Sequence, residues 1–259
     1  MSATVIDSQI HGFLFGTEEM NIVFSEKSWV QKWLDTEAAL AQAQGELGVI
    51  PKEKADIIVK YAKAALIDIP SIGEGYKSSI TIVPLLNAFK KVLPEHAGEY
   101  VHWGATSQDI VDTGMVLLER DAYDIILRDA KACLKAILKL VKKYRATPEA
   151  GRTHVVHAIP ITFGYKAAVW ADELGRQIER LEGMKKRVFV GEMAGAVGTL
   201  ASQPEKGLET QQRMFEILGL EVPTIAWHVA RDNQAAFASM LALLAGTLGR
   251  IAHQLFPLP

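Results

Sequence analysis

The sequence predicts an all-α fold from three observations. Apolar residues recur at helical spacing along several very long segments. Alternating strand patterns are almost absent from the chain. The composition, with 49% hydrophobic and 22% charged residues among 259, is that of an ordinary globular protein with a sizeable core.

The first hundred residues are expected to form a small helical domain. One apolar face predicts a first helix, formed by Trp29, Trp33, Leu40 and Leu47. This helix ends at Gly48, and Pro51 opens the next one. Residues 71–79 are interpreted as a loop, and a further helix is expected from residue 81 to 92, before Pro94. A turn near Gly98 predicts the boundary between an N-terminal helical domain, residues 1–100, and a central helical-bundle domain, residues 101–259.

Three long apolar stripes predict the helices of the bundle. They consist of Leu118, Ala122, Ile126, Ala130, Cys133, Ile137, Val141 and Tyr144; then Phe163, Ala167, Trp170, Leu174, Ile178, Leu181, Met184 and Val188, after Pro160; and finally Phe237, Leu241, Leu244, Leu248, Ile251 and Leu255. Residues 233–249 are free of charge but too short and too polar for a membrane span, so we interpret them as a buried helix. Helices this long commonly expose apolar surface that one chain leaves uncovered, and we therefore expect oligomerisation.

Charge and cysteine content exclude several classes of partner. The chain has 28 basic and 30 acidic residues and no block of Lys or Arg, so nucleic acid is not an expected partner. Cys133 is the only cysteine, which excludes an intrachain disulfide and a cysteine-based zinc cluster. Residues 1–9 lack the basic flank and apolar run of a secretory signal. We expect a cytoplasmic protein without a membrane partner.

Residues 102–109 form a polar cluster at the start of the first long helix. Thr106 followed by Asp109 approximates a capping box, in which the hydroxyl and the carboxylate bond free N–H groups. Capping does not explain the histidine, tryptophan, serine and glutamine that surround this pair. A helix start also presents unpaired N–H groups and a positive dipole end, so the cluster suits the carboxylate of an acidic substrate.

Residues 151–160 contain two histidines, His154 and His157, at i and i+3. The helical zinc-protease pattern requires an i, i+4 pair with a Glu inside it, so a metal is not expected here. A histidine in a loop between rigid helices is suited to proton transfer near neutral pH, although a structural role is the alternative. Arg152 either binds an anion or caps a carbonyl.

Two later segments complete the set. The glycine-rich residues 191–199 follow a helix rather than a strand, which excludes the dinucleotide and phosphate-loop patterns and leaves a flexible connection as the default interpretation. Arg231 and Asp232 begin the third long helix. Asp232 is an ordinary acid for a helix start, whereas capping does not explain Arg231.

Taken in order, these segments resemble the fumarase/aspartase superfamily of lyases, from about Phe15 onward. The resemblance rests on Thr106-Ser107-Gln108-Asp109, on Gly151-Arg152-Thr153-His154 with Pro160 and Gly164, on Gly195-Ala196-Val197-Gly198-Thr199, and on Arg231-Asp232. Other runs are most similar to the 3-carboxy-cis,cis-muconate cycloisomerase branch: Phe15-Gly16-Thr17, Glu37-Ala38-Ala39-Leu40-Ala41 and Val101-His102-Trp103-Gly104. Adenylosuccinate lyases are similar through residues 151–158.

The resemblance implies a homotetramer with a large helical bundle, in which each active site is assembled from three subunits. Members eliminate a group β to a carboxylate of a succinate-type dicarboxylate, usually releasing fumarate, or run the related addition or lactonisation. No metal or cofactor is expected. A base removes a proton next to a carboxylate, an aci-carboxylate intermediate forms, and an acid protonates the leaving group. By resemblance, His154 is the general acid or its relay, and His102 is a second active-site histidine.

The resemblance also implies the substrate-binding residues. Thr106 and Ser107 would hold the substrate carboxylate, Gln108 would lie nearby, and Arg231 would lie near the same pocket.

Three departures bear on the substrate and the activity. Ile80 stands where adenylosuccinate lyases carry another histidine, and bacterial cycloisomerases commonly lack a histidine at the position of His154. An enzyme that eliminates from another substituted succinate fits both facts. The family's mobile loop with its base serine is not found before Pro259, so we expect this 259-residue chain to lack meaningful turnover.

Four functions therefore stay open. The leading one is a lyase most like the cycloisomerase, and the second is an adenylosuccinate lyase. A third is an inactive helical assembly protein or fragment that reuses the scaffold. A metal-dependent hydrolase built on His154 and His157 ranks last.

Overall fold

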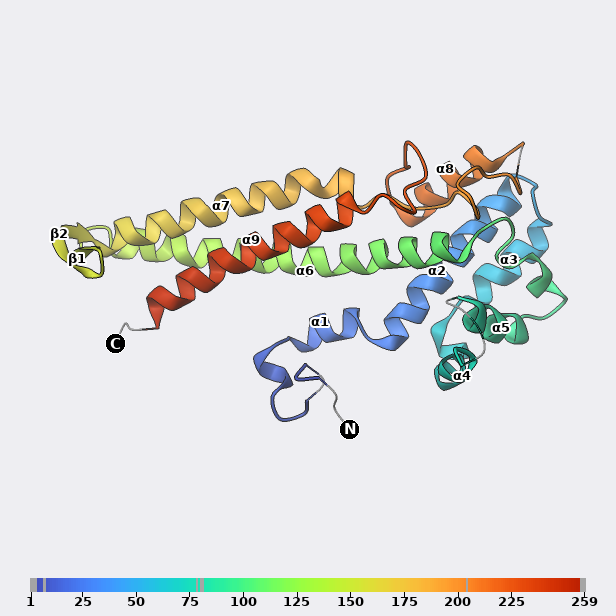
Figure 1. Ribbon diagram of the computed structural model, residues 1–259, viewed down its shortest axis with the longest axis horizontal. Coiled ribbons are helices and arrows are strands. Elements are labelled where there is room, and N and C mark those ends of the chain that lie inside the picture. Colours follow the sequence, from blue (N-terminus) through green and yellow to red (C-terminus); the bar gives the residue numbers. More distant parts are fainter. Residues whose placement is uncertain (1–3, 7, 78, 80–81, 204, 257–259) are drawn as a thin grey trace. The chain divides into compact units, whose positions relative to one another are not determined.

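A computed structural model describes residues 4–6, 8–77, 79, 82–203 and 205–256 and confirms the all-α prediction (Figure 1). Ile80 and residue 81, the predicted start of a helix, lie outside the described residues. The elements are η1 (Gly12–Leu14), α1 (Glu18–Val23), α2 (Glu26–Glu46), α3 (Lys52–Tyr61), η2 (Ala64–Leu66), α4 (Ile69–Gly75), α5 (Val83–Val92), η3 (Ala97–Tyr100), α6 (Ser107–Lys143), β1 (Pro148–Thr153), β2 (Val156–Thr162), α7 (Phe163–Val188), α8 (Gly207–Leu218) and α9 (Asp232–Leu255).

The chain forms two compact units. Unit 1 comprises residues 1–122 and 189–231, and unit 2 comprises residues 123–188 and 232–259. Helix α6 contributes its first part to unit 1 and the remainder to unit 2. The sequence-based boundary near residue 100 stays a prediction.

Unit 1 is organised around α2, which packs on α3 and α8 and shares one hydrophobic core with α3 and α5. Its core includes the fully buried side chains of Leu34, Ile58, Leu85 and Phe89. Ser25 caps the start of α2 by accepting a hydrogen bond from the N–H of Ser28. The helix ends before Gly48, whose φ of +71° favours glycine, as the sequence predicts.

The loop predicted for residues 71–79 is wrong in its first half. Residues Ile69–Gly75 form α4, with Pro70 in the first turn, where its missing N–H breaks no helical bond. Ile72 is buried and gives this short helix a contact with the core. The glycines and serine that suggested a loop are tolerated because α4 has only seven residues.

Unit 2 contains α7, α9 and the remainder of α6, which run alongside one another (Figure 1). The predicted apolar stripe of α7 is buried from Ala167 to Val188. Polar contacts tie α7 to α9: Trp170 Nε1 donates to Gln254 Oε1 at 2.8 Å, and Gln177 Nε2 donates to Thr247 Oγ1 at 3.1 Å.

The interpretation of α9 as a buried helix is wrong for most of its surface. Only Phe237, Leu244, Thr247 and Ile251 are buried, because the described chain covers a single stripe of the helix. Of the helices in the described ranges, α9 alone is long and apolar enough, by length and composition, to cross a membrane. Its polar bonds to α7 hold it in the bundle.

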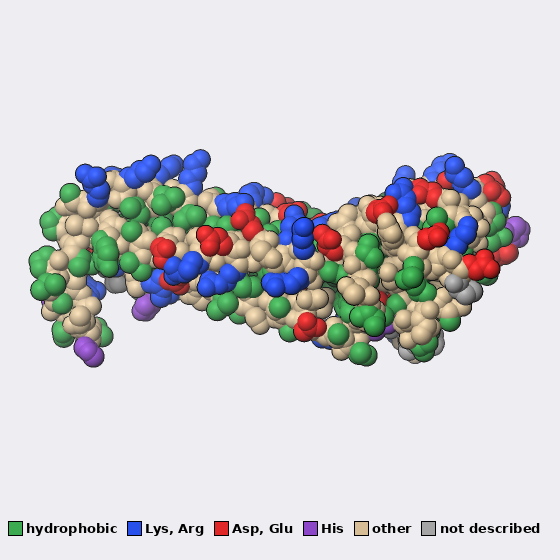
Figure 2. Space-filling model, turned by 90° about the horizontal axis from the view of Figure 1, so that it is seen from above, with side chains coloured by type: hydrophobic (Ala, Val, Ile, Leu, Met, Phe, Trp, Pro, Cys, Tyr) green, Lys and Arg blue, Asp and Glu red, His purple; other side chains and the backbone are tan. Residues whose placement is uncertain are grey.

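A β-hairpin replaces the loop expected at residues 151–160. Strands β1 and β2 pair antiparallel, and their two-residue turn has positive φ at both His154 (+51°) and Val155 (+68°), as a type I′ turn requires. Most of the hairpin's side chains are exposed on both faces, so burial imposes no alternating pattern that sequence analysis could detect. Pro160 lies in β2, and helix α7 begins at Phe163, directly after this strand. Oγ1 of Thr162 accepts a hydrogen bond from the N–H of Tyr165 in the first turn of α7. Figure 2 shows hydrophobic side chains on the surface at this end of the bundle.

Candidate active site

The buried carboxylate of Asp109 joins three segments of unit 1. Its Oδ2 accepts from the N–H of Thr106 (2.8 Å) and of Gly195 (3.0 Å). Its Oδ1 accepts from the N–H of Ala194 (3.0 Å) and lies 2.8 Å from Nε2 of His228. The capping bond to Thr106 confirms the carboxylate half of the predicted capping box. Asp109 also fixes the glycine-rich loop against the start of α6, which capping alone did not predict.

The glycine-rich loop is packed rather than exposed at its start, because residues 191–195 are buried. Thr113 Oγ1 donates to the carbonyl of Glu192 at 2.8 Å and accepts from its N–H at 2.9 Å. Hydrogen bonds to α6 therefore hold the loop from two residues, Asp109 and Thr113. These contacts do not fit the interpretation of the glycine-rich loop as a flexible connection.

The segment before α9 is bound to the same place. The N–H of Trp227 donates to Glu192 Oε2, and the indole Nε1 donates to the carbonyl of Gly191 at 2.9 Å. Arg231 donates to Asp112 Oδ1 at 2.9 Å and to the carbonyl of His228 at 2.7 Å, and its guanidinium lies 5.4 Å from the centre of the Trp227 ring. These contacts account for Arg231, which helix capping does not explain.

Burial and negative charge perturb two carboxyl groups in this region. Burial raises the pKa of Glu192, although the bond from Trp227 and the nearby imidazole of His228 oppose the shift. Burial and the charge of Asp112 raise the pKa of Glu119, two turns further along α6, to about 7. Perturbed carboxyls of this kind are frequent at functional sites.

The start of α6 offers groups for an anion. The side chains of Thr106, Ser107 and Gln108 are half-buried, and the structure records no hydrogen bond between them and the described residues. Because α6 begins at Ser107, the first N–H groups of the helix and its positive dipole end lie beside these side chains. The arrangement suits a carboxylate.

His102 lies in the loop that leads into α6. Its Nδ1 is 2.6 Å from Oε1 of Glu37, a buried residue of α2. Gln44, also on α2, donates to the carbonyl of Trp103 at 2.7 Å. Helix α2 therefore anchors this loop at two points.

Five of the six residues predicted for the site belong to unit 1: Thr106, Ser107, Gln108, His102 and Arg231. The sixth, His154, lies in unit 2 at the exposed tip of the hairpin, with no partner recorded among the described residues.

One cluster has the spacing of a possible metal site, because its candidate ligand atoms lie within 4.8 Å of one another. It consists of Asp109, Glu192 and His228. Both oxygens of Asp109 already accept two hydrogen bonds each, and Glu192 Oε2 accepts from Trp227. Of the carboxylate oxygens in this cluster, only Glu192 Oε1 receives no hydrogen bond from the described residues. The geometry is that of a hydrogen-bonded network, because a cation would have to displace most of these donors.

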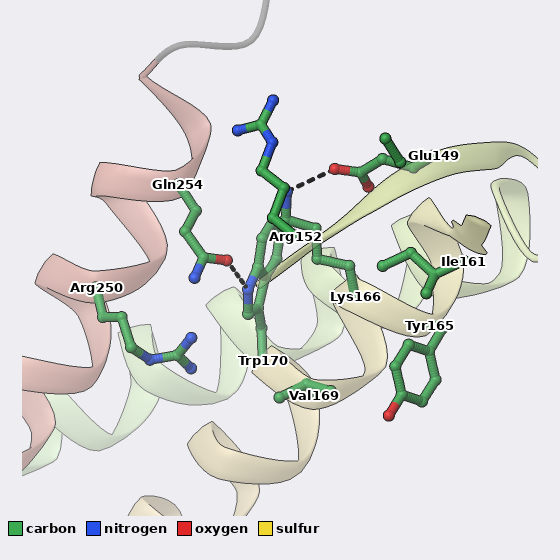
Figure 3. A pocket seen from close by; sticks show the side chains of 10 residues that line it. Glu149, Arg152, Ile161, Tyr165, Lys166, Val169, Trp170, Arg250 and Gln254 are labelled. Atoms are coloured by element: carbon green, nitrogen blue, oxygen red, sulfur yellow. Dashed lines mark hydrogen bonds and ion pairs between the residues drawn. The ribbon is translucent and has the colours of Figure 1, made fainter. Parts of the chain in front are cut away.

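Unit 2 has a basic hollow of about 370 Å³ between the hairpin, α7 and α9 (Figure 3). Arg152, Lys166 and Arg250 line it, beside Trp170 and Val169. Lys166 is paired with Glu149 at 2.7 Å and Arg250 with Glu173, whereas no partner is recorded for Arg152 in the described part of the chain. The proposed carbonyl cap for Arg152 is therefore not observed there.

Sequence reasoning missed the network residues Glu37, Glu192 and His228. Glu37 carried a signal, because it lies four residues after Trp33 and three before Leu40, on the apolar face of α2. A glutamate at a core position needs a partner. Glu192 and His228 had no comparable local signal, because their partners are distant in the sequence. Glu192 bonds with Thr113, 79 residues away, and His228 contacts Asp109, 119 residues away.

Comparison with known proteins agrees with this architecture. A sequence model of the family described as Lyase matches residues 15–258. The N-acetyl-S-(2-succino)cysteine lyase of Enterococcus italicus is 45% identical over the whole chain, which covers 57% of that relative. The adenylosuccinate lyase of Methanothermobacter thermautotrophicus is 44% identical over 94% of the chain and 55% of the relative.

A solved structure has the same fold. The 3-carboxy-cis,cis-muconate lactonizing enzyme from Pseudomonas putida superposes with a TM-score of 0.92 at 33% identity, over 96% of this chain and 58% of that one. The chain thus spans a little over half the length of the proteins it matches.

Proposed function

This chain belongs to the lyase family of the fumarase/aspartase superfamily, and on that premise we propose that its protein cleaves a succinyl group from a heteroatom by β-elimination. The observation that carries the proposal is the start of α6. There, the side chains of Thr106, Ser107 and Gln108 stand beside the first N–H groups of the helix, and the structure records no hydrogen bond from these side chains to the described residues. Asp109, which anchors this helix start, has its charge offset by three N–H donors and by His228.

A thioether of succinate is the substrate class that we favour. Two relatives named N-acetyl-S-(2-succino)cysteine lyase are 45% and 41% identical over the whole chain, while a cycloisomerase relative is 37% identical. A thioether also fits the two departures in the sequence, at Ile80 and His154, that weaken the purine and lactonisation alternatives. Adenylosuccinate, in which nitrogen carries the succinyl group, is the runner-up because of relatives at 44% identity.

The chemistry for a thioether R–S–CH(COO⁻)–CH₂–COO⁻ is a two-step elimination. A base removes a proton from the CH₂ carbon, and the electron pair passes into the adjacent carboxylate to give an aci-carboxylate. The C–S bond then breaks, its electrons leave with sulfur as a thiolate, and fumarate forms. An acid protonates the thiolate.

The residues of this chain take binding and proton-transfer roles in that scheme. Thr106, Ser107 and the helix start hold a carboxylate, where charge accumulates in the aci-carboxylate. Gln108 and Arg231 lie at the same helix start. By the family resemblance, His154 acts as the general acid or its relay, in a site to which more than one subunit contributes. The base serine of the family is outside these 259 residues, so turnover is proposed for an enzyme that includes it.

Family membership also supports a proposal about assembly. We infer a homotetramer in which apolar side chains of the bundle, such as Leu138, Val169 and Leu243, are covered by other copies. Each is about half exposed in the single chain.

Ligand-dependent stability tests the anion site. Fumarate or succinate should raise the melting temperature of the 259-residue chain, because a ligand that binds only the native state stabilises it by mass action. Ser107→Ala should remove most of that shift, and Ser71→Ala, which alters an exposed hydroxyl in α4, should leave it intact. Succinamide, which has the same shape without charge, should give no shift. Equal shifts for both variants would refute the assignment.

A turnover assay tests the chemistry. The short chain should release no fumarate from S-(2-succino)cysteine derivatives or adenylosuccinate at enzymatic rates. A protein extended by the serine loop should release it, and His154→Ala in that protein should slow it by about 10²–10⁴-fold. Rapid turnover by the short chain would refute the role given to the serine.

A further inference from the structure

A buried carboxylate holds the ring of His102. Its Nδ1 lies 2.6 Å from Oε1 of Glu37, 65 residues earlier in the chain. The side chain of Glu37 is 1% exposed, and that of His102 is 17% exposed. The histidine therefore connects a core acid to the surface of unit 1.

Stability does not explain the presence of Glu37. It is surrounded on α2 by buried apolar side chains such as Leu34 and Leu40, and its second oxygen, Oε2, is buried and receives no hydrogen bond from the residues that the structure describes. Removing a carboxylate from water costs several kcal/mol, and well-packed apolar residues at such positions are often neutral or stabilising. His102 is the only partner recorded for Glu37 in the described part of the chain.

The backbone of His102 is also under constraint. Its φ is +66°, a left-handed conformation that costs free energy for a residue with a side chain. Helix α2 holds the loop from two residues on one face, two turns apart: Glu37 at the ring of His102 and Gln44 at the carbonyl of Trp103. Strain of this kind persists where the surroundings fix the conformation, and it concentrates at functional sites.

The contact also defines which ring nitrogen is available. A carboxylate accepts hydrogen bonds, so Nδ1 carries a hydrogen and Nε2 is the unbonded nitrogen of the neutral ring. Because Nδ1 faces the buried acid, the exposed part of the ring is the opposite edge, which carries Nε2. No bond from Nε2 to a described residue is recorded.

We propose that Glu37 is a positioning residue that fixes His102 in the Nδ1–H form and presents Nε2 to the anion held at the start of α6. When a dicarboxylate binds, Nε2 takes up one proton from solution, and the new N–H donates a hydrogen bond to a carboxylate oxygen of the ligand. The charge of Glu37 balances the imidazolium. The inference rests on the proposed function, because the anion is the substrate of that site.

The first experiment examines the tautomer without a ligand. In protein labelled with ¹⁵N at its histidines, and with the His102 signals assigned by loss in His102→Asn, the neutral ring should show a protonated Nδ1 and a bare Nε2. Glu37→Leu should shift the ring toward the Nε2–H form that predominates in free histidine. A protonated Nε2 in the wild type, or an unchanged ring in Glu37→Leu, would overturn the positioning role.

The second experiment measures proton uptake on binding. Titration calorimetry with fumarate, in buffers of different ionisation enthalpy, should show net proton uptake on binding in the wild type. Glu37→Gln keeps the size of the side chain but cannot balance an imidazolium, so uptake should vanish and binding should weaken about tenfold. Glu46→Gln, which alters an exposed ion pair at the end of α2, is the matched control and should behave as the wild type.

The outcomes separate the two proposals. Fumarate binding with the same proton uptake in the wild type and in Glu37→Gln would overturn the dyad and leave the proposed function standing. Absence of binding in the wild type would overturn the proposed function and the role of Nε2 together, while the ¹⁵N spectra would still decide whether Glu37 fixes the tautomer. Unfolding curves of Glu37→Gln and Glu37→Leu would identify any loss caused by misfolding.

Discussion

Nε2 of His228 lies 2.8 Å from Oδ1 of Asp109, although 119 residues separate them. The imidazole is also 3.8 Å from Oε1 of Glu192, so it stands between two buried carboxylates. This single side chain links the start of α6, the glycine-rich loop and the segment that carries Arg231.

Replacing His228 with Ala should lower the free energy of unfolding by about 2–3 kcal/mol, because Asp109 loses a hydrogen bond to a charged group. Chemical denaturation would measure the change. His96→Ala is the control, since the side chain of His96 is 89% exposed and its ion pair lies on the surface, where such pairs contribute little. Equal effects of the two substitutions would contradict a structural role for His228.

Glu119 predicts a pH dependence of stability. Its folded-state pKa of about 7 lies above the ordinary value of 4.5, so its favourable contribution is present below about 4.5 and is lost as pH rises through 7. Glu119→Gln should therefore be more stable than the wild type at about pH 8, by about 1–3 kcal/mol, and the difference should vanish toward pH 4.5. Denaturation at several pH values would test this, and a difference independent of pH would contradict it.

Two glycines give opposite predictions for the same substitution. A Cβ on Gly191 would overlap the ring of Phe215, which is fully buried, so Gly191→Ala should destabilise the protein by about 3 kcal/mol. Gly183 lies on the exposed face of α7 with open space around it, and Gly183→Ala should stabilise by about 0.5–1 kcal/mol. Thermal unfolding of both variants provides the measurement. A neutral Gly191→Ala would show that Phe215 moves aside at little cost.

Self-association is expected through the bundle. Leu243 on α9 is 53% exposed, and Leu243→Glu should shift the protein toward monomer in sedimentation at micromolar concentration. Val197→Glu, at an 80% exposed position of unit 1, is the control and should leave the assembly unchanged. A well-folded wild-type monomer at these concentrations would rule out the tetramer.

The prediction of helices succeeded where one face of the helix is buried against other parts of the same chain. The α7 stripe is buried from Ala167 to Val188, all of its predicted length except Phe163, because one face meets its neighbours and the other meets solvent. The same reasoning overstated the burial of α9, since a seam of apolar residues does not reveal whether its partner is in the same chain. It missed the hairpin around His154, where neither face is buried.

The candidate site was predictable only in its local part. The bond from Asp109 to Thr106 spans three residues and follows from a motif. The hydrogen bonds that Asp109 accepts from Ala194 and Gly195, and its contact with His228, depend on the tertiary fold. No spacing in the sequence predicts them. The roles of the six site residues stay predictions; these residues are His154, His102, Thr106, Ser107, Gln108 and Arg231.

The discontinuity of unit 1 has a consequence for biosynthesis. Residues 123–188, which belong to unit 2, separate its two parts in the sequence. At about 5–20 residues per second, a ribosome needs about 6–24 s to travel the 119 residues from Asp109 to His228. Throughout that interval the nascent carboxylate is without its imidazole and has to remain hydrated. Unit 1 therefore completes its fold only after the unit 2 part of α6, the hairpin and α7 have been synthesised, and a pause before residue 228 would prolong the exposure of its core to chaperones and proteases.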